Sequence, residues 1–148
     1  MRVRPLTAAD AAAIASWRYP GRYSTYEFDE PPACDGDTWA VTDADELAGY
    51  CCFGAPARVA GAAEAPGTLD VGYGLAPDRM GHGVGPGFVG TILEFALSQF
   101  DPQRLRLYIL EWNERSRKVA AKHGFTVESV LASDEGPFLV MTRGAVPG

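Results

Sequence analysis

The stretch Arg79-Met80-Gly81-His82-Gly83-Val84-Gly85-Pro86-Gly87-Phe88 (RMGHGVGPGF) places a glycine at every second position from 81 to 87. Glycines at this density weaken helix and strand alike, which indicates that something approaches the bare backbone. Successive N–H groups at the start of a helix form a nest for anions such as a pyrophosphate. Pro86 fits this interpretation, because a proline at the first helical position lacks only an N–H that the helix does not use.

Two widespread phosphate-binding patterns do not fit this stretch. A P-loop requires GxxxxGK[ST], and no lysine followed by serine or threonine occurs here. A dinucleotide fingerprint requires GxGxxG, and in the two registers Pro86 or Phe88 stands where the last glycine is needed. The glycines therefore belong either to another phosphate-binding motif or to a turn that only packs a helix on a strand.

The residues around this turn predict a strand before it and a helix after it. The segment 68–75 alternates, so that Asp70, Gly72 and Gly74 share one face and the larger apolar residues share the other. Apolar residues then recur at helical spacing over 88–100. The turn is thus expected to connect a strand to the N-terminus of a helix.

The C-terminal part of the chain predicts a strand over 105–112 and a helix over 113–124. Asn113 is the expected N-cap and Gly124 the expected stop of this helix. Two final strands are expected over 125–132 and 138–144.

The N-terminal part predicts a strand over 1–6 and a helix that starts at Thr7. Thr7 and Asp10 have the spacing of a capping box with Asp in place of Glu. A hairpin is expected over 38–54, with a polar turn at 43–45. The order of elements predicts a mixed α/β fold with one central sheet, in a single domain over 1–148.

Composition and charge narrow the function. The 148 residues carry a formal net charge of −6, which argues against a nucleic-acid or membrane-surface binder. No segment has the length of a membrane span or the apolar core of a signal peptide, and we expect a cytoplasmic protein. Adjacent Cys51 and Cys52 should not pair with each other, and no spacing indicates a metal site.

Two stretches resemble motifs of the GCN5-related N-acetyltransferase (GNAT) superfamily. Residues 80–85 resemble its acetyl-CoA signature, [Arg/Gln]-x-x-Gly-x-[Gly/Ala], although Met80 stands at the Arg/Gln position and Arg79 lies one residue early. Residues 112–125 (WNERSRKVAAKHGF) are similar to its later motif. With Asn113-x-x-Ser116 they look most like the branch that acetylates ribosomal-protein N-termini. The resemblance implies the mostly antiparallel, helix-flanked sheet of the acyl-CoA N-acyltransferase fold.

The resemblance further implies an enzyme that moves an acetyl group from acetyl-CoA to a primary amine by direct attack in a ternary complex. The amine would belong to a peptide N-terminus or a small molecule, and a homodimer is an open alternative. Residues implied to bind the cofactor are Leu75, Ala76, Arg79, Met80, Gly81, His82, Gly83, Val84, Gly85, Gly87, Asn113 and Ser116. The rival interpretation is a catalytically silent acyl-CoA-binding or protein-interaction domain on the same fold.

Three catalytic tasks are assigned on this basis. Asp70 is the candidate general base, which requires burial to raise its pKa or a water relay. A strand N–H near Leu75 or Ala76 would stabilise the developing oxyanion. Many family members protonate the departing sulfur with a tyrosine at the position of Ala120, so Ser116 is the candidate acid here.

The acceptor would contact the aromatic and acidic segment 17–30 (WRYPGRYSTYEFDE), whose aromatic residues suit a cation. The alternative is that these rings only fill space between helix and sheet. Asn113 and Ser116 likewise have two interpretations: they bind the cofactor, or they only cap the helix, since both residue types are common helix caps.

Overall fold

The computed structural model describes residues 1–146, in which seven strands form one sheet of order β1-β2-β3-β4-β5-β7-β6. All neighbouring strands run antiparallel except β4 and β5, which are parallel. This confirms the mixed, mostly antiparallel sheet, while the last two residues of the domain expected over 1–148 lie outside the described part. The strands are β1 (Arg2–Pro5), β2 (Thr38–Asp43), β3 (Glu46–Phe53), β4 (Thr68–Leu75), β5 (Arg104–Leu110), β6 (Thr126–Leu131) and β7 (Phe138–Gly144).

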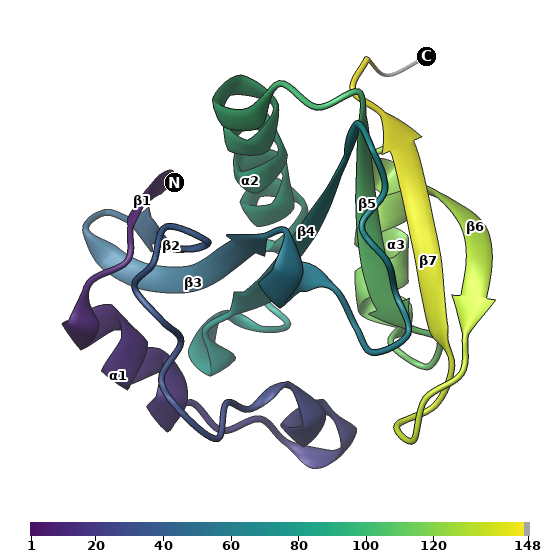
Figure 1. Cartoon of the computed structure of the whole chain (residues 1–148). Coiled ribbons are helices and arrows are strands. Elements are labelled where there is room, and N and C mark those ends of the chain that lie inside the picture. Colours follow the sequence, from purple (N-terminus) through teal and green to yellow (C-terminus); the bar gives the residue numbers. More distant parts are fainter. Residues whose placement is uncertain (147–148) are drawn as a thin grey trace.

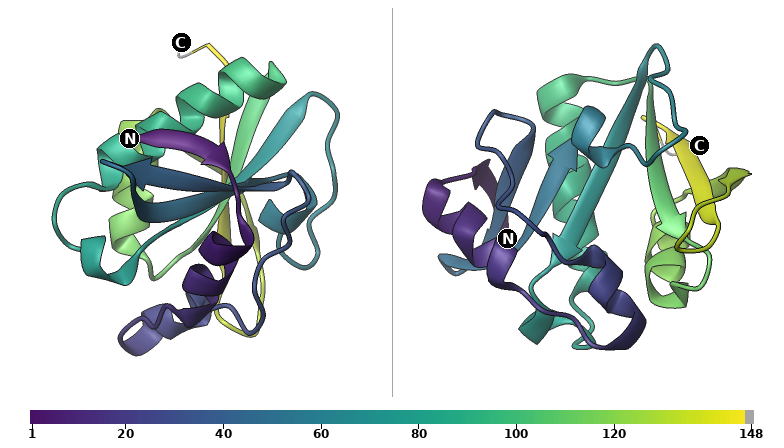
Figure 2. Two further views of the ribbon diagram at one scale, coloured as in Figure 1. Left: turned by 90° about the vertical axis from the view of Figure 1, so that its left-hand side faces the viewer. Right: turned by 60° about the horizontal axis from the view of Figure 1, so that its bottom comes forward.

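Helices cover both faces of this sheet (Figures 1 and 2). One face carries α1 and the 3-10 helix η1, and the other carries α2 and α3. No helix in the described residues is long and apolar enough to cross a membrane. The helices are α1 (Ala8–Ser16), α2 (Gly85–Phe100), α3 (Glu114–Lys122), and the 3-10 helices η1 (Gly21–Tyr26), η2 (Ala55–Ala57) and η3 (Pro77–Arg79).

The capping box predicted at the start of α1 is present. The Thr7 hydroxyl accepts a hydrogen bond from the Asp10 N–H at 3.2 Å, and Asp10 Oδ2 accepts one from the Thr7 N–H at 2.9 Å. Asp10 is also paired with Arg4 at 2.6 Å. These contacts fix the angle at which the chain leaves β1 and enters α1.

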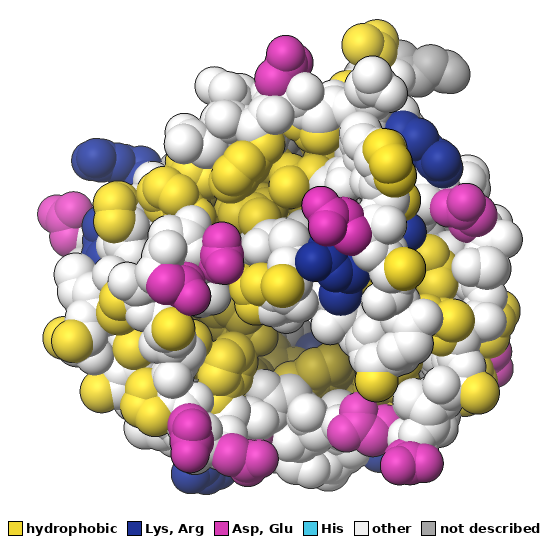
Figure 3. Space-filling model, viewed as in Figure 1, with side chains coloured by type: hydrophobic (Ala, Val, Ile, Leu, Met, Phe, Trp, Pro, Cys, Tyr) yellow, Lys and Arg dark blue, Asp and Glu magenta, His cyan; other side chains and the backbone are white. Residues whose placement is uncertain are grey.

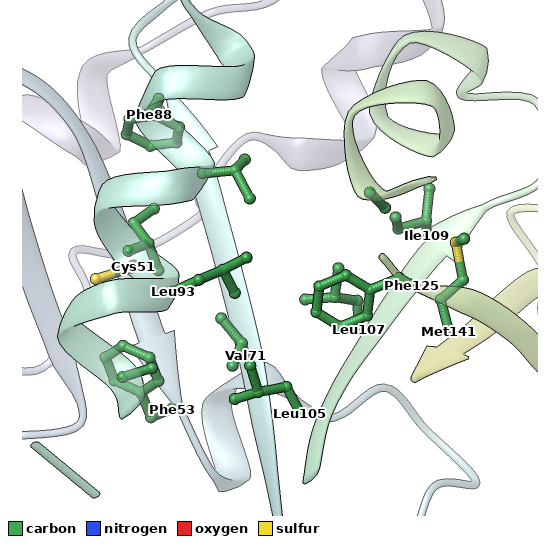
Figure 4. Close-up of a cluster of buried hydrophobic side chains, with 14 of the residues drawn as sticks. Cys51, Phe53, Val71, Phe88, Leu93, Leu105, Leu107, Ile109, Phe125 and Met141 are labelled. Atoms are coloured by element: carbon green, nitrogen blue, oxygen red, sulfur yellow. The ribbon is translucent and has the colours of Figure 1, made fainter. Parts of the chain in front are cut away.

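The main core lies between α2 and the two central strands β4 and β5 (Figure 4). Leu93 of α2 lies on the side of Val71 of β4, and Phe88 packs farther along α2 against Tyr73 of β4. Leu105 and Leu107 extend the same apolar layer along β5. Because α2 is anchored along its length by buried side chains, its N-terminus is held in a fixed position beside the end of β4.

The strands β4 and β5 pair at one end and then separate. Pairing covers Thr68–Asp70 against Arg104–Arg106, and beyond it the strands diverge (Figures 1 and 2). The Ala76 N–H donates to the Ala48 carbonyl, and the Gly54 N–H donates to the Asp70 carbonyl. The backbone N–H and C=O groups of the even-numbered residues of β4 therefore point toward β3. In an antiparallel ladder the odd-numbered residues then direct N–H and C=O into the gap.

Candidate active site

A cavity of about 470 Å³ fills the gap between β4 and β5. Figure 3 shows it as a hollow with apolar walls on the face of the molecule in front of the sheet. Its wall is formed by β4, β5, the turn before α2, the first turns of α2 and α3, and η1. The cavity therefore meets both stretches that resemble family motifs, 79–88 and 112–125, at one place in the fold.

The glycine-rich turn presents free backbone N–H groups to this cavity. Gly81 and Gly83 have φ of 78° and 75°, a conformation that side-chain-bearing residues rarely adopt. The first helical hydrogen bond of α2 is donated by Phe88 to Val84, so the N–H groups of Gly85 and Gly87 precede it. A Cβ at Gly83 would meet no atom within 4 Å, which leaves an open cradle that fits a pyrophosphate.

The arginine beside this turn is Arg115 rather than Arg79. The Arg79 guanidinium is paired with Asp43 at 3.1 Å and Glu46 at 3.0 Å, so it is engaged by the β2–β3 hairpin. Arg115 Nη2 instead lies 4.0 Å from the position of a Cβ on Gly81 and lines the cavity. The sequence did not place Arg115 beside the turn, because its spacing in α3 gives no sign that the helix start lies next to that turn.

Backbone donors on β4 support Leu75 over Ala76 as the oxyanion contact. Ala76 does not line the cavity, and its N–H is taken by the Ala48 carbonyl at 2.8 Å. Leu75 lines the cavity on the odd-numbered edge, and its carbonyl accepts the Tyr19 hydroxyl at 2.6 Å.

The glycines within β4 have a packing explanation rather than a cofactor one. A Cβ on Gly72 would lie 2.8 Å from Cys52 Sγ, and one on Gly74 would lie 2.5 Å from the Tyr50 ring. The face that Asp70 shares with them is therefore covered by the protein's own side chains.

Asp70 lies at the point where β4 and β5 separate, and it does not line the cavity. Its carboxylate accepts hydrogen bonds from Arg106 Nε at 2.6 Å, Arg58 Nη1 at 2.9 Å and the Tyr108 hydroxyl at 3.0 Å. Burial alone would raise the pKa of Asp70, but the bonds from Arg106, Arg58 and Tyr108 outweigh it and hold the pKa below its ordinary value. A carboxylate so stabilised is a weak base, so its surroundings argue against the role predicted for it.

The start of α3 combines a cap with a cavity wall. Asn113 Oδ1 accepts the Ser116 N–H at 3.2 Å, and Asn113 Nδ2 donates to the Tyr26 hydroxyl at 2.9 Å. Asn113 thus caps the helix, as one of the alternatives held, and both Asn113 and Ser116 line the cavity. Ala120 is fully buried in the core, so α3 offers no acid at that position.

The expected acceptor segment divides between the cavity and the core. Tyr19, Tyr23 and Tyr26 line the cavity, whereas Trp17 and Phe28 pack against the smaller core beside α1. Tyr23 also meets Trp112 edge-on, with ring centroids 5.3 Å apart. The segment is therefore divided: its tyrosines lie where an acceptor could reach them, and Trp17 and Phe28 fill space between helix and sheet.

Nine of the predicted site residues line the one cavity, and four do not. The lining ones are Leu75, Arg79, Met80, Gly81, Gly83, Val84, Gly85, Asn113 and Ser116. Those outside the lining are Asp70, Ala76, His82 and Gly87. Within residues 1–146 no group of three or more His, Cys, Asp or Glu is placed to hold a metal ion.

The sheet splays between β4 and β5, and the glycine-rich turn lies at the open end, an arrangement that fits a phosphate-bearing donor held between the two strands. The model of the acetyltransferase (GNAT) domain family matches residues 1–126. The chain therefore belongs to the GNAT acetyltransferases and is an acetyl-CoA-dependent N-acetyltransferase.

Solved structures share this fold at low sequence identity. Aminoglycoside acetyltransferase AAC(6')-Ib in complex with coenzyme A is 17% identical, with a TM-score of 0.74 over 97% of this chain and 94% of that one. A spermidine N-acetyltransferase SpeG chimera from Vibrio cholerae and hSSAT is 14% identical, with a TM-score of 0.74 over 97% and 95%. A GNAT-family acetyltransferase from Bacillus anthracis is also 14% identical, with a TM-score of 0.74 over 97% and 93%. A search of curated proteins found no significant match.

Proposed function

We propose that the protein transfers an acetyl group from acetyl-CoA to the primary amine of a small molecule, by direct attack while both substrates are bound. The observation that carries this proposal is the continuity of the cavity from the glycine-rich turn to the tyrosines of η1. Donor and acceptor would therefore share one space. AAC(6')-Ib bound to coenzyme A and kanamycin, and the spermidine acetyltransferase, are proteins of this fold that act on small amines.

Direct transfer is supported by what lines the cavity. The lining contains no cysteine, and Ser116 has no histidine or carboxylate beside it in the lining to activate it as a nucleophile. The donor supplies an activated acetyl group when bound. The chain's own part is to hold the phosphates at the turn, to offer the Leu75 N–H to the carbonyl oxygen and to place Ser116 near the sulfur.

The residues that line the cavity also bear on how the amine loses its proton. No Asp, Glu or His lines the cavity in the described part of the chain. We therefore assign no general base, and the amine loses its proton to solvent. Under this proposal kcat/KM rises with pH until the pKa of the acceptor amine is reached.

Two measurements test the proposal. Saturating acetyl-CoA should raise the melting temperature, because a ligand that binds only the folded state stabilises it. Free-thiol release should then depend on the amine, in a panel of small amines and of peptides with free N-termini. If acetyl-CoA binds but no amine produces free-thiol release, the protein is instead the catalytically silent acyl-CoA-binding domain.

A peptide N-terminus is the second candidate acceptor. It is supported by the pattern Asn113-x-x-Ser116, which resembles the branch that acetylates ribosomal-protein N-termini. A preference for peptides over small amines in the same panel would establish this acceptor and contradict the first.

A further inference from the structure

Tyr73 carries a buried hydroxyl that lies near Ser116 but makes no hydrogen bond of good distance and angle within the described residues. It is an odd-numbered residue of β4, and its ring meets Phe88 of α2 edge-on with centroids 6.2 Å apart. The hydroxyl oxygen makes no hydrogen bond to any residue between 1 and 146. A buried, unpaired polar atom is costly, and such atoms in native proteins often mark functional positions.

The Tyr73 side chain belongs to the cavity wall beside α3. Tyr73 and Ser116 both line the cavity. Burial raises the pKa of Tyr73 to about 12, and the neighbouring Ser116 hydroxyl offsets part of this rise. The phenol therefore enters the reaction protonated throughout the pH range in which an enzyme works, so it has a proton to donate.

Three other tyrosine hydroxyls of the cavity wall make hydrogen bonds within the protein. Tyr19 donates to the Leu75 carbonyl at 2.6 Å, and Tyr108 donates to Asp70 at 3.0 Å. Tyr26 accepts from Asn113 at 2.9 Å. Tyr73 is thus the cavity tyrosine whose hydroxyl is buried and, among the described residues, has only the Ser116 hydroxyl near it, without a hydrogen bond of good geometry.

We propose that Tyr73 protonates the sulfur that leaves during acetyl transfer, with Ser116 beside it as a second hydroxyl on that sulfur. This role rests on the proposed function. It gives a residue of β4 the task of proton donor, which Ala120 of α3 cannot perform. As the N–C bond forms and the C–S bond breaks, Tyr73 gives its proton to sulfur. The phenolate then takes the proton that the newly acylated nitrogen must lose. One proton moves from nitrogen to sulfur, and no other reactant is needed.

The variant Tyr73→Phe keeps the ring in place and removes only the hydroxyl. We expect kcat at saturating acetyl-CoA to fall roughly 100-fold, in the range of a lost general acid. The melting temperature should stay the same or rise, because the folded protein loses an unpaired buried group. Trp39→Phe is the matched control: it removes another buried, unpartnered donor, on β2 and outside the cavity lining, and should leave kcat unchanged at a temperature where the variant is folded.

A binding measurement gives a readout without turnover. At about pH 9.5 the free thiol of coenzyme A, with a pKa of about 8.5, is largely thiolate. Calorimetry gives, for each protein, the ratio of its affinity for coenzyme A to its affinity for desulfo-coenzyme A. This ratio should be roughly tenfold larger for wild type than for Tyr73→Phe, because the variant lacks a hydrogen bond to the charged sulfur.

The outcomes separate this inference from the proposed function. A wild type that binds no acetyl-CoA or releases no thiol overturns the proposed function, and with it the role of Tyr73. A working wild type with unchanged kcat in Tyr73→Phe overturns the Tyr73 role alone. A loss of kcat accompanied by equal preference for coenzyme A in both proteins assigns Tyr73 to packing and also contradicts the proposal.

Discussion

Asp70 and Arg106 face each other across the last paired position of β4 and β5, with Arg106 Nε 2.6 Å from Asp70 Oδ1. Arg106 also donates to the Ala63 carbonyl at 2.7 Å, which ties the segment between η2 and β4 to the same point. Figure 3 shows basic side chains at the surface between β4 and β5, next to the hollow. The pair lies where the two strands stop pairing, so it sets where the cavity begins.

Asp70→Asn should therefore destabilise the protein. Asp70 is 1% exposed and neutralises two arginines, Arg58 and Arg106. Removing one partner of a buried ion pair costs about 3 kcal/mol, because the remaining charges stay desolvated. Urea unfolding measures the loss. Asp43→Asn is the matched control, since Asp43 pairs with Arg79 at the surface and should cost less than about 1 kcal/mol.

The same variant decides the role that sequence analysis gave Asp70. A general base would show a large loss of kcat with little change in stability. The structure leads us to expect the reverse, when activity is measured at a temperature where both proteins are folded. An Asp70→Asn variant of normal stability and greatly reduced kcat would return Asp70 to the mechanism.

Acid should unfold the protein through its two buried aspartates. The Arg4 guanidinium lowers the pKa of Asp10 to about 2, and the pKa of Asp70 is also held below its ordinary value. In the unfolded chain each takes up a proton near pH 4. Their stabilisation is thus complete above about pH 4 and is lost as the pH falls toward the folded pKa values.

Asp10→Asn tests this linkage. The pKa difference at Asp10 corresponds to about 2 kcal/mol, which the variant should lack at neutral pH. The free energy of unfolding should then fall less steeply between about pH 5 and pH 2 than in wild type. Equal slopes would show that the Arg4–Asp10 pair does not couple to folding.

Local features of the fold could be predicted because short-range patterns encode them. The Thr7–Asp10 capping box, the Asn113 cap and the turn before α2 each depend on residues within a few positions. The alternation in β4 also placed Asp70 on the correct face. It could not reveal that η2 and Tyr50 cover that face, since they come from other parts of the chain.

The partners within the site could not be predicted for the same reason. Arg58 and Arg106 lie 12 and 36 positions from Asp70, and only the fold brings them together. Tyr73 reads as a core residue, because its alternation matches that of Val71 and Leu75. Its hydroxyl becomes informative only when it is known to make no hydrogen bond of good geometry within the described residues.

Arg115→Ala should weaken the binding of coenzyme A roughly tenfold, because a charge-assisted contact to phosphate is lost. Arg115 also lies over the Tyr23 ring at 5.6 Å, so its side chain is held between the turn and η1. Calorimetry with coenzyme A measures the change. Lys118→Ala is the control, since it removes a charge from α3 at an exposed pair with Glu114.

The phosphate that Arg115 contacts can be assigned with 3'-dephospho-coenzyme A. The Arg115 guanidinium lies close to Gly81, beside the turn that is proposed to hold the pyrophosphate. We therefore expect the same weakening with and without the 3'-phosphate. Weakening seen only with intact coenzyme A would move Arg115 to the 3'-phosphate, and no weakening with either ligand would remove it from the site.

Gly83→Ala tests whether the backbone of the turn holds the donor. Gly83 has a φ of 75° and faces open space, so an alanine strains the backbone by about 1 kcal/mol and places a methyl in the cradle. Gly36→Ala is the matched control, because Gly36 has a φ of 92°, is equally open and lies before β2. In urea denaturation, both variants should show a similar decrease in the free energy of unfolding. Only Gly83→Ala should also lose affinity for coenzyme A, by roughly tenfold or more, since the phosphate is pushed away from the amides. If the two variants bind coenzyme A equally well, the turn does not hold the pyrophosphate, and the donor must lie elsewhere in the gap between β4 and β5.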